Sequence, residues 1–156
     1  MTTVTSKHVA QSFIALAQRE GMTLINLRLQ RLVIIAHGVH LACFDSPLFF
    51  ENIQAWDFGP VESELYNALR PMGSGVVSVD FLKPDFEILK NNHRASQAIR
   101  ATWEAYRSMS DLQLERCVKA SGGPWDIIWR LHGQRYFDIP NGLFKLYYEP
   151  MIKKVA

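Results

Sequence analysis

The run from Thr23 to Cys43 is the longest stretch of apolar residues at helical spacing, and it constrains the fold more than any other part of the chain. Apolar side chains recur three or four residues apart from Ile25 to Cys43, which places them on one face of a helix. Further apolar residues, such as Ile34 and Leu41, fall on the opposite side and leave little surface for water. Because a helix that is apolar nearly all round packs inside a domain, we predict a core helix here, capped by Thr23.

Counting residues argues against a membrane-spanning role for this run. A spanning helix needs about 20 consecutive apolar residues, whereas Arg28, Arg31, His37 and His40 interrupt the run earlier. No basic and apolar leader with a cleavage site precedes Ser6, which favours the cytoplasm. We therefore expect a cytoplasmic protein with no membrane partner.

Residues 47–61 change character, from a buried helix to aromatic residues and turn formers. Residues 48–56 are rich in large apolar side chains and predict a weak strand or an extended piece. Gly59 and Pro60 predict a break, followed by a proline in the first turn of a helix, where its missing N–H costs nothing. Glu62 would then place negative charge beside the positive end of that helix.

Cap and breaker residues divide the remaining chain into further helices. Gly21 is a natural stop after the first helix, Asn92 can cap a later one, and Ser110 with Gln113 has the form of a capping box. Pro150 is expected to end or kink the last helix and leave a loose tail. The expected helices are 6–20, 23–43, 60–70, 92–109, 111–120, one from 124 and one from 138 to 148, with 76–89 irregular.

Length and composition fit one domain with an ordinary core. The chain has 156 residues, of which 48% are hydrophobic and 21% charged, and this length can bury a core without disulfides. We predict a mainly α, single-domain fold over residues 1–156, with its core at about 6–149. It should contain six or seven helices and a small β or irregular insert.

Charge and cysteine usage narrow the partners and the compartment. A net charge of +2 gives no clustered basic face of the kind that nucleic acid requires. The two cysteines, Cys43 and Cys117, lie within apolar helical patterns and are expected to be buried thiols of a reducing compartment. We therefore expect neither a nucleic-acid partner nor a disulfide framework.

The residues offer little for catalysis. His37 and His40 lie one helical turn apart, a spacing that can hold a metal, but zinc needs at least a third protein ligand and no metal motif accompanies them. We interpret them as structural histidines and keep a small metal-dependent enzyme only as an alternative. Cys117 has no nearby basic partner in the sequence. The prediction is a protein that is not an enzyme and has no cofactor and no metal.

Aromatic residues are more informative. Trp103, Trp125 and Trp129 are expected to pack in the core, whereas Trp56, beside a turn, should expose part of its ring. Tryptophan and tyrosine dominate binding hot spots because they combine a large area with a polar tip. The predicted partner-binding residues are Phe50, Trp56, Asp57, Phe58, Glu62 and Tyr66.

Gln30 is a polar residue within the core helix, and a buried amide without partners costs about 1–3 kcal/mol. We expect it to bond backbone groups of the turn at 56–60 and so to tie the core helix to the aromatic segment.

The order of these features resembles the Panacea domain, a phage-associated domain found in many antitoxins. The resemblance extends from about Val9 to Tyr148. It includes a helix-opening threonine, a leucine and glutamine core motif, an aromatic segment closed by Gly-Pro-Val, and a later Pro-Trp. The structural motif residues that it picks out are Thr23, Gln30, Gly59, Pro60, Val61, Pro124 and Trp125. This chain departs from the family pattern just before Pro124. The family often has polar residues there, including a histidine, whereas residues 120–123 of this chain are Ala, Ser, Gly and Gly.

The resemblance implies an antitoxin, or an immunity-like protein, that neutralises a co-encoded toxin by direct binding. One branch of the family, similar to the SocA-type proteins, instead delivers its toxin to a cytoplasmic ATP-dependent protease as an adaptor. The implied partners are thus a cognate protein toxin and, in the alternative, a protease or a chaperone. A second copy of the chain is a further candidate, docking on residues 48–50.

Overall fold

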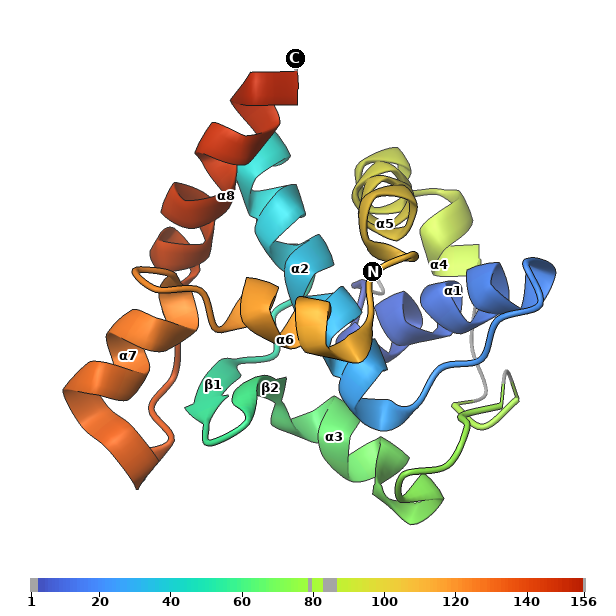
Figure 1. Cartoon of the computed structure of the whole chain (residues 1–156). Helices are drawn as coiled ribbons and strands as arrows, with labels where there is room; N and C mark the ends of the chain where they lie inside the picture. Colours follow the sequence, from blue (N-terminus) through green and yellow to red (C-terminus); the bar gives the residue numbers. More distant parts are fainter. Residues whose placement is uncertain (1–2, 79, 83–86, 156) are drawn as a thin grey trace.

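The computed structural model describes residues 3–78, 80–82 and 87–155, with side chains as far as Ile152, and the described part is mainly α-helical, as predicted (Figure 1). It contains eight α-helices, two short 3-10 helices and one two-stranded antiparallel sheet. In chain order these are α1 (Ser6–Arg19), α2 (Asn26–Phe44), β1 (Ile53–Trp56), β2 (Gly59–Glu62), α3 (Ser63–Leu69), η1 (Arg70–Met72), α4 (Glu87–Lys90), α5 (His93–Tyr106), α6 (Asp111–Val118), α7 (Pro124–His132), η2 (Gly133–Arg135) and α8 (Asn141–Val155).

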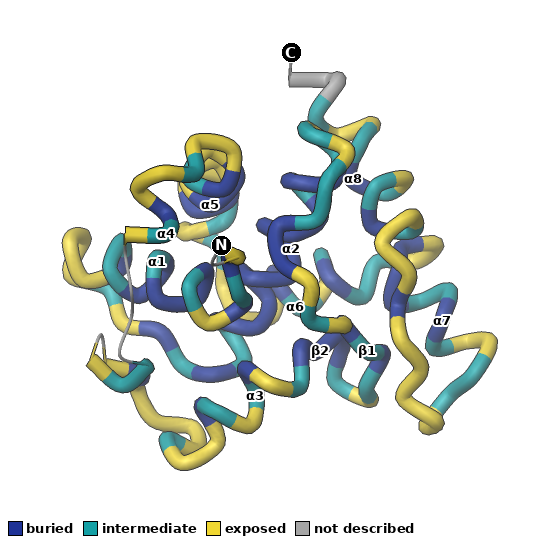
Figure 2. Tube along the Cα trace, turned by 180° about the vertical axis from the view of Figure 1, so that it is seen from behind, coloured by how far each residue is buried: buried dark blue, intermediate teal, exposed yellow. Residues whose placement is uncertain are grey.

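Helix α2 is the centre of the fold. α1 and α5 pack along one side of it and α8 along another, and most of its length is buried (Figures 1 and 2). Leu29, Leu32 and every residue from Val33 to His37 are at most 1% exposed. By length and composition α2 could also cross a membrane, so counting its polar residues does not settle the matter. However, 67% of the 18-residue apolar stretch within α2 is buried inside the structure, as is usual for a core helix.

Helix α8 approaches α2 most closely at Gly38. A Cβ atom at this position would lie 2.3 Å from Cδ2 of Tyr148, far inside van der Waals contact. Tyr148 is itself only 4% exposed. The absence of a side chain at Gly38 is therefore what allows the Tyr148 ring to lie flat against the α2 backbone.

The predicted start of the core helix is wrong by three residues. α2 begins at Asn26 with Ile25 as its N-cap, and no side chain caps it, so the exposed Thr23 is not the cap. The reason is a tertiary contact: Val77 N–H donates to the Leu24 carbonyl at 2.9 Å, and Ile25 pairs with Val76 as an isolated bridge. Pairing with residues 76–77 holds residues 24–25 in an extended conformation, so the helix begins later in the sequence than predicted.

Strands β1 and β2 form a hairpin with a two-residue turn, and this corrects the expected helix at 60–70. Trp56 pairs with Gly59, whose φ of +128° favours glycine. Pro60 lies in β2 rather than in the first turn of a helix, and α3 starts only at Ser63. Pro60 pairs with Ala55.

A third extended segment, 137–139, lies beside β1. Ala55 N–H donates to the Phe137 carbonyl at 3.0 Å, and Ile139 N–H donates to the Ile53 carbonyl at 2.7 Å. The 137–139 segment thus covers the outer edge of β1 through these two bonds. This pairing explains why α8 starts at Asn141, after the predicted position near Asp138.

Glu62 ends β2 and is 1% exposed. Gln30 bonds its backbone twice: Gln30 Nε2 donates to the Glu62 carbonyl and Glu62 N–H donates to Gln30 Oε1, both at 3.0 Å. The Glu62 carboxylate caps α3 by accepting from the N–H groups of Glu64 and Leu65, and it accepts the Ser6 hydroxyl at 2.6 Å. Gln30 therefore ties α2 to the end of β2, beyond the 56–60 turn that was expected.

Several of the other helix boundaries match their sequence signals. The Ser110 capping box, the Asn92 cap and the left-handed Gly21 after α1 are all confirmed. The short helix α4 was not predicted. Pro150 neither ends α8 nor leaves the tail loose, because the helix continues to Val155. Pro150 is exposed, so water can satisfy the carbonyl that its missing N–H leaves free.

The prediction of two buried thiols is wrong. Cys43 is exposed and Cys117 is half-buried, with its Sγ 3.8 Å from Sδ of Met109. Cys43 lies near the end of α2, where α5 and α8 leave an apolar groove of about 430 Å³ that Cys43 lines. Partial burial, each in its own surroundings, raises the pKa of both the Cys43 and the Cys117 thiol.

We expect Gln30→Leu to lower the free energy of unfolding by about 2–4 kcal/mol, because it leaves the N–H and the carbonyl of Glu62 buried without partners. Urea denaturation measures this loss. Gln97→Leu, at an exposed position of α5, is the matched control and should change stability by less than about 0.5 kcal/mol. Equal effects of the two substitutions would contradict the role assigned to Gln30.

Candidate protein-binding surface

The hairpin turn brings together aromatic rings from three parts of the chain. Trp56 and Phe58 flank Asp57 in the turn, and their ring centroids are 5.9 Å apart in an edge-on arrangement. Tyr66 of α3 contacts both rings, at 5.2 Å from Trp56 and 5.9 Å from Phe58. Edge-on and tilted contacts at these distances are the favoured geometry for aromatic pairs.

Tyr136 completes the cluster from the far side of the sequence. Its ring stacks on Trp56 with centroids 5.3 Å apart and an interplanar angle of 22°, and its hydroxyl donates to Oδ1 of Asp57. That hydrogen bond is the main reason why the pKa of Tyr136 is raised. We call Trp56, Asp57, Phe58, Tyr66 and Tyr136 the aromatic surface.

Tyr136 was not among the residues predicted from the sequence to bind a partner. It directly follows η2 and adopts the left-handed conformation, with φ of 54°, and no local pattern connects it to a turn 80 residues earlier. The pairing of 137–139 with β1 brings it there. The unusual conformation is a feature of the structure that sequence spacing does not reveal.

The backbone of Trp56 is fixed by the Pro-Trp motif. Trp125 Nε1 donates to the Trp56 carbonyl at 2.7 Å, and Trp56 Nε1 donates to Oε1 of Gln54 at 3.0 Å. Trp125 is 8% exposed, stacks on Trp129 at 5.4 Å and has the Lys119 ammonium 4.9 Å from its ring centroid. Pro124 starts the helix that carries Trp125. The motif thus holds the hairpin turn against α7.

The aromatic surface is open to solvent. Trp56, Phe58 and Tyr66 are half-buried, and Asp57 and Tyr136 are exposed. Two large apolar side chains are exposed as well: Leu131 in α7 at 70% and Phe137, next to Tyr136, at 42%. Exposed apolar side chains and aromatic rings are typical of protein-binding sites.

Two of the predicted partner-binding residues do not belong to this surface. Glu62 is buried and its carboxylate is occupied by Ser6 and the N-terminus of α3, so it cannot form part of an exposed rim. Phe50 is 72% exposed, but it lines a separate hollow with residues such as Pro47 and Arg94. Leu48 is buried, so the segment proposed for a second copy exposes little more than Phe50.

The two histidines of α2 are both buried and each has a protein partner. His37 Nε2 lies 2.9 Å from Oδ1 of Asn141, and the His37 ring is 4.3 Å from that of Phe49. His40 Nδ1 lies 2.5 Å from the Ser46 carbonyl. Within the described residues, no three His, Cys, Asp or Glu side chains are grouped so as to hold a metal ion. These contacts connect α2 to α8 and to the 45–50 segment.

Comparison with known proteins assigns the family. The family described as "Antitoxin SocA-like, Panacea domain" matches residues 29–126, a range that contains Gln30, the hairpin, Tyr66 and the Pro-Trp motif. The chain belongs to this family of Panacea-domain antitoxins. Antitoxin SocA of Caulobacter vibrioides (strain NA1000 / CB15N) is 31% identical over 134 residues, which cover 80% of this chain and 70% of the relative. No solved structure matches the chain.

Burial lowers the pKa of His37 to about 4, from an ordinary value of 6.5. The unfolded chain therefore takes up a proton below about pH 6.5 whereas the folded chain does not, and stability falls as the pH drops from 6.5 towards 4. Between pH 7 and pH 5 we expect this group to cost about 1–2 kcal/mol of unfolding free energy.

Chemical denaturation of the protein and of His37→Leu at pH 7 and pH 5 measures this cost. The variant should lose less stability over this interval than the parent chain, whereas substitution of the exposed His93 by Gln should leave the loss unchanged. His40, whose pKa is also lowered by burial, contributes in the same direction and remains in both proteins.

Proposed function

We propose that this protein neutralises a protein toxin by binding it directly through the aromatic surface, without catalysis, in the cytoplasm of a bacterium. Membership of an antitoxin family supports a toxin as the partner. The Tyr136 ring at the solvent boundary, stacked on Trp56 and hydrogen-bonded to Asp57, is the observation that carries the choice of surface.

The physical argument is one of preorganisation. Binding costs free energy when side chains must be ordered, about 0.5–1.5 kcal/mol for each rotamer-rich side chain. Here Trp56 is already held by Tyr136, Tyr66 and Phe58, so a partner meets rings that are in place. Rigid aromatic rings with polar tips are the residues that contribute most to protein interfaces.

The charged groups at this surface set the orientation of a partner rather than the bulk of the affinity. Asp57 is exposed and accepts the Tyr136 hydroxyl, which leaves further lone pairs on its carboxylate for a donor from the toxin. An interface of this kind favours a partner that presents apolar side chains together with a Lys, an Arg or a hydroxyl group.

We expect Trp56→Ala to abolish neutralisation while the protein remains folded. The side chain is half-buried, and the backbone carbonyl that accepts from Trp125 is retained in the variant. Loss of a central tryptophan should weaken toxin binding by at least about 2 kcal/mol, roughly thirtyfold. Growth rescue on co-expression with the product of the neighbouring gene, together with calorimetry on the purified pair, measures both effects.

Phe50→Ala is the matched control, because it removes an exposed aromatic ring outside the aromatic surface. It should preserve both rescue and affinity. A neighbour that is harmless on its own, or a Trp56→Ala variant that binds and rescues as well as Phe50→Ala, would contradict the proposal.

The same experiment separates neutralisation by binding from delivery to a protease. Direct neutralisation requires a stable complex of purified components and rescue at an unchanged level of toxin. An adaptor would instead lower the level of toxin, and rescue would disappear in cells that lack the ATP-dependent protease.

A further inference from the structure

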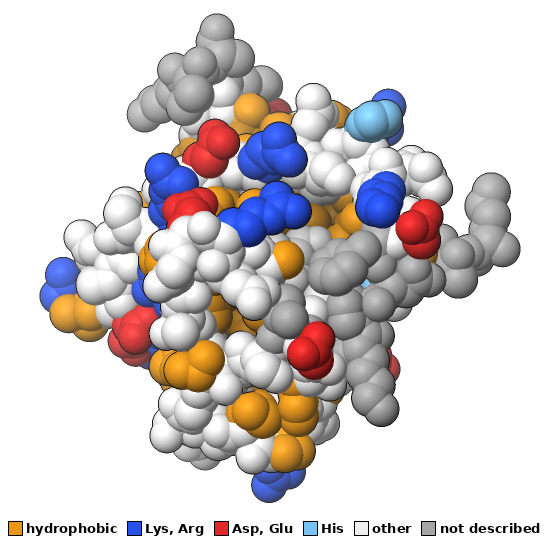
Figure 3. Space-filling model, turned by 90° about the vertical axis from the view of Figure 1, so that its right-hand side faces the viewer, with side chains coloured by type: hydrophobic (Ala, Val, Ile, Leu, Met, Phe, Trp, Pro, Cys, Tyr) orange, Lys and Arg blue, Asp and Glu red, His pale blue; other side chains and the backbone are white. Residues whose placement is uncertain are grey.

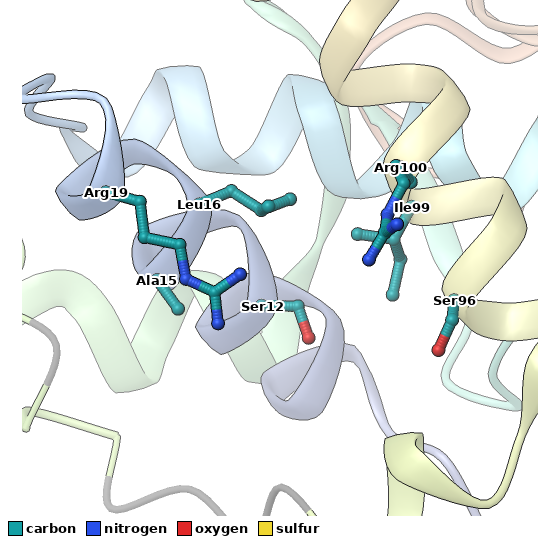
Figure 4. Close-up of a pocket in the computed structure, with 7 residues that line it drawn as sticks. All are labelled: Ser12, Ala15, Leu16, Arg19, Ser96, Ile99 and Arg100. Carbon is teal, nitrogen blue, oxygen red and sulfur yellow. The ribbon is translucent and has the colours of Figure 1, made fainter.

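A second surface, which shares no residue with the aromatic surface, lies between α1 and α5. Figure 3 views the side of the molecule towards α1 and α4 and shows several Lys and Arg side chains over apolar atoms in the upper part of this face, with Asp and Glu side chains among them. A groove with a volume of about 150 Å³ separates the two helices (Figure 4). It is lined by Ser12, Ala15, Leu16 and Arg19 of α1 and by Ser96, Ile99 and Arg100 of α5.

Arg19 and Arg100 are exposed, and their guanidinium groups extend from opposite walls towards the space between the helices (Figure 4). Neither forms an ion pair or a side-chain hydrogen bond within the described part of the chain. The acid nearest to Arg19 in sequence, Glu20, is already engaged by Arg107 at 2.9 Å and by Trp103 Nε1 at 2.6 Å. The acid nearest to Arg100, Glu104, lies one turn further along α5 and does not line this groove. Among the residues that the structure describes, no carboxylate lines the groove.

The rest of the lining offers apolar surface and no free hydrogen-bond donor. Ile99 is buried and Leu16 is half-buried between the two arginines. The Ser12 hydroxyl donates to the His8 carbonyl at 3.2 Å, and the Ser96 hydroxyl donates to the Leu89 carbonyl at 3.0 Å. Each hydroxyl has a single proton, so only the guanidinium groups remain to donate to a ligand.

We propose that this groove binds an acidic segment of a partner protein. A carboxylate would lie between Arg19 and Arg100, which can grip it through paired N–H donors, and an adjacent apolar side chain would cover Leu16 and Ile99. The two positive charges, with no acidic side chain among the described residues that line the groove, are complementary to such a segment.

Guanidinium groups bind phosphate as well as carboxylate. Many phosphate sites also use backbone N–H groups and free hydroxyls, whereas residues 12–19 and 96–100 lie within helices whose amides are used. The apolar floor of Leu16 and Ile99 therefore favours a glutamate or aspartate beside a leucine or isoleucine over a phosphate group.

The test uses the whole chain and a blocked hexapeptide of alternating glutamate and leucine, titrated at low ionic strength and followed by amide NMR. We expect saturable shifts at Leu16, Arg19, Ile99 and Arg100. The Arg19→Gln/Arg100→Gln double variant should bind about tenfold more weakly or worse, since charge-assisted hydrogen bonds to a carboxylate are lost.

The control is the Arg70→Gln/Arg116→Gln double variant, which removes the same charge at two exposed positions outside the groove. It should bind the peptide as the parent chain does. A peptide with glutamine in place of glutamate should not bind, and 0.5 M salt should weaken the binding of the acidic peptide.

Four results would overturn the proposal: no saturable shift in the parent chain, shifts that map outside the groove, equal losses in the two double variants, or equally tight binding of inorganic phosphate. Because all four arginines are exposed, thermal unfolding should show that both variants are folded. None of these results bears on toxin neutralisation through Trp56, because the aromatic surface uses other residues.

Discussion

Two hydrogen bonds between the Gln30 amide and the backbone of Glu62 join the central helix to the hairpin, and the placement of the other elements depends on them. Because Gln30 is buried in α2, no water can replace either bond. The same Glu62 caps α3 through its side chain and accepts the Ser6 hydroxyl at the start of α1. One residue thus fixes the relative positions of α1, α2, β2 and α3.

The hairpin that leaves this junction is held at its far end by a second set of contacts. Trp125 bonds the Trp56 carbonyl, and the 137–139 segment pairs with β1. The turn between Trp56 and Gly59 is therefore fixed from both sides, by α7 and by the strand-like segment before α8. The aromatic surface is thus held in place by hydrogen bonds from residues that are not part of it.

The sequence predicts the features that rest on local chemistry. The mainly α class, the capping box at Ser110 and the helix start at Pro124 depend on neighbouring residues, and the structure confirms them. A buried glutamine must find partners, so a bond from Gln30 to backbone near the hairpin could be expected, although its partner proved to be Glu62.

Features that depend on distant pairing were not predictable in this way. Thr23 has the chemistry of a cap, but the bridge between Ile25 and Val76 overrides it. Glu62 carries a charge and was assigned to the surface, yet its tertiary partners bury it. Tyr136 joins the aromatic surface only because a segment 80 residues away lies beside β1.

The hairpin also restricts how any partner can be recognised. In an antiparallel pair successive residues point their backbone groups alternately inwards and outwards. On β1 the outward carbonyl of Ile53 and the outward N–H of Ala55 are bonded by 137–139, which lies along that edge. On β2 the outward positions are Pro60, which has no N–H, and Glu62, whose N–H and carbonyl are bonded by Gln30. An added strand would therefore have to displace a segment on one flank and would find no outward N–H on β2 to pair with on the other, so that side-chain contacts are the favoured way to recognise this sheet.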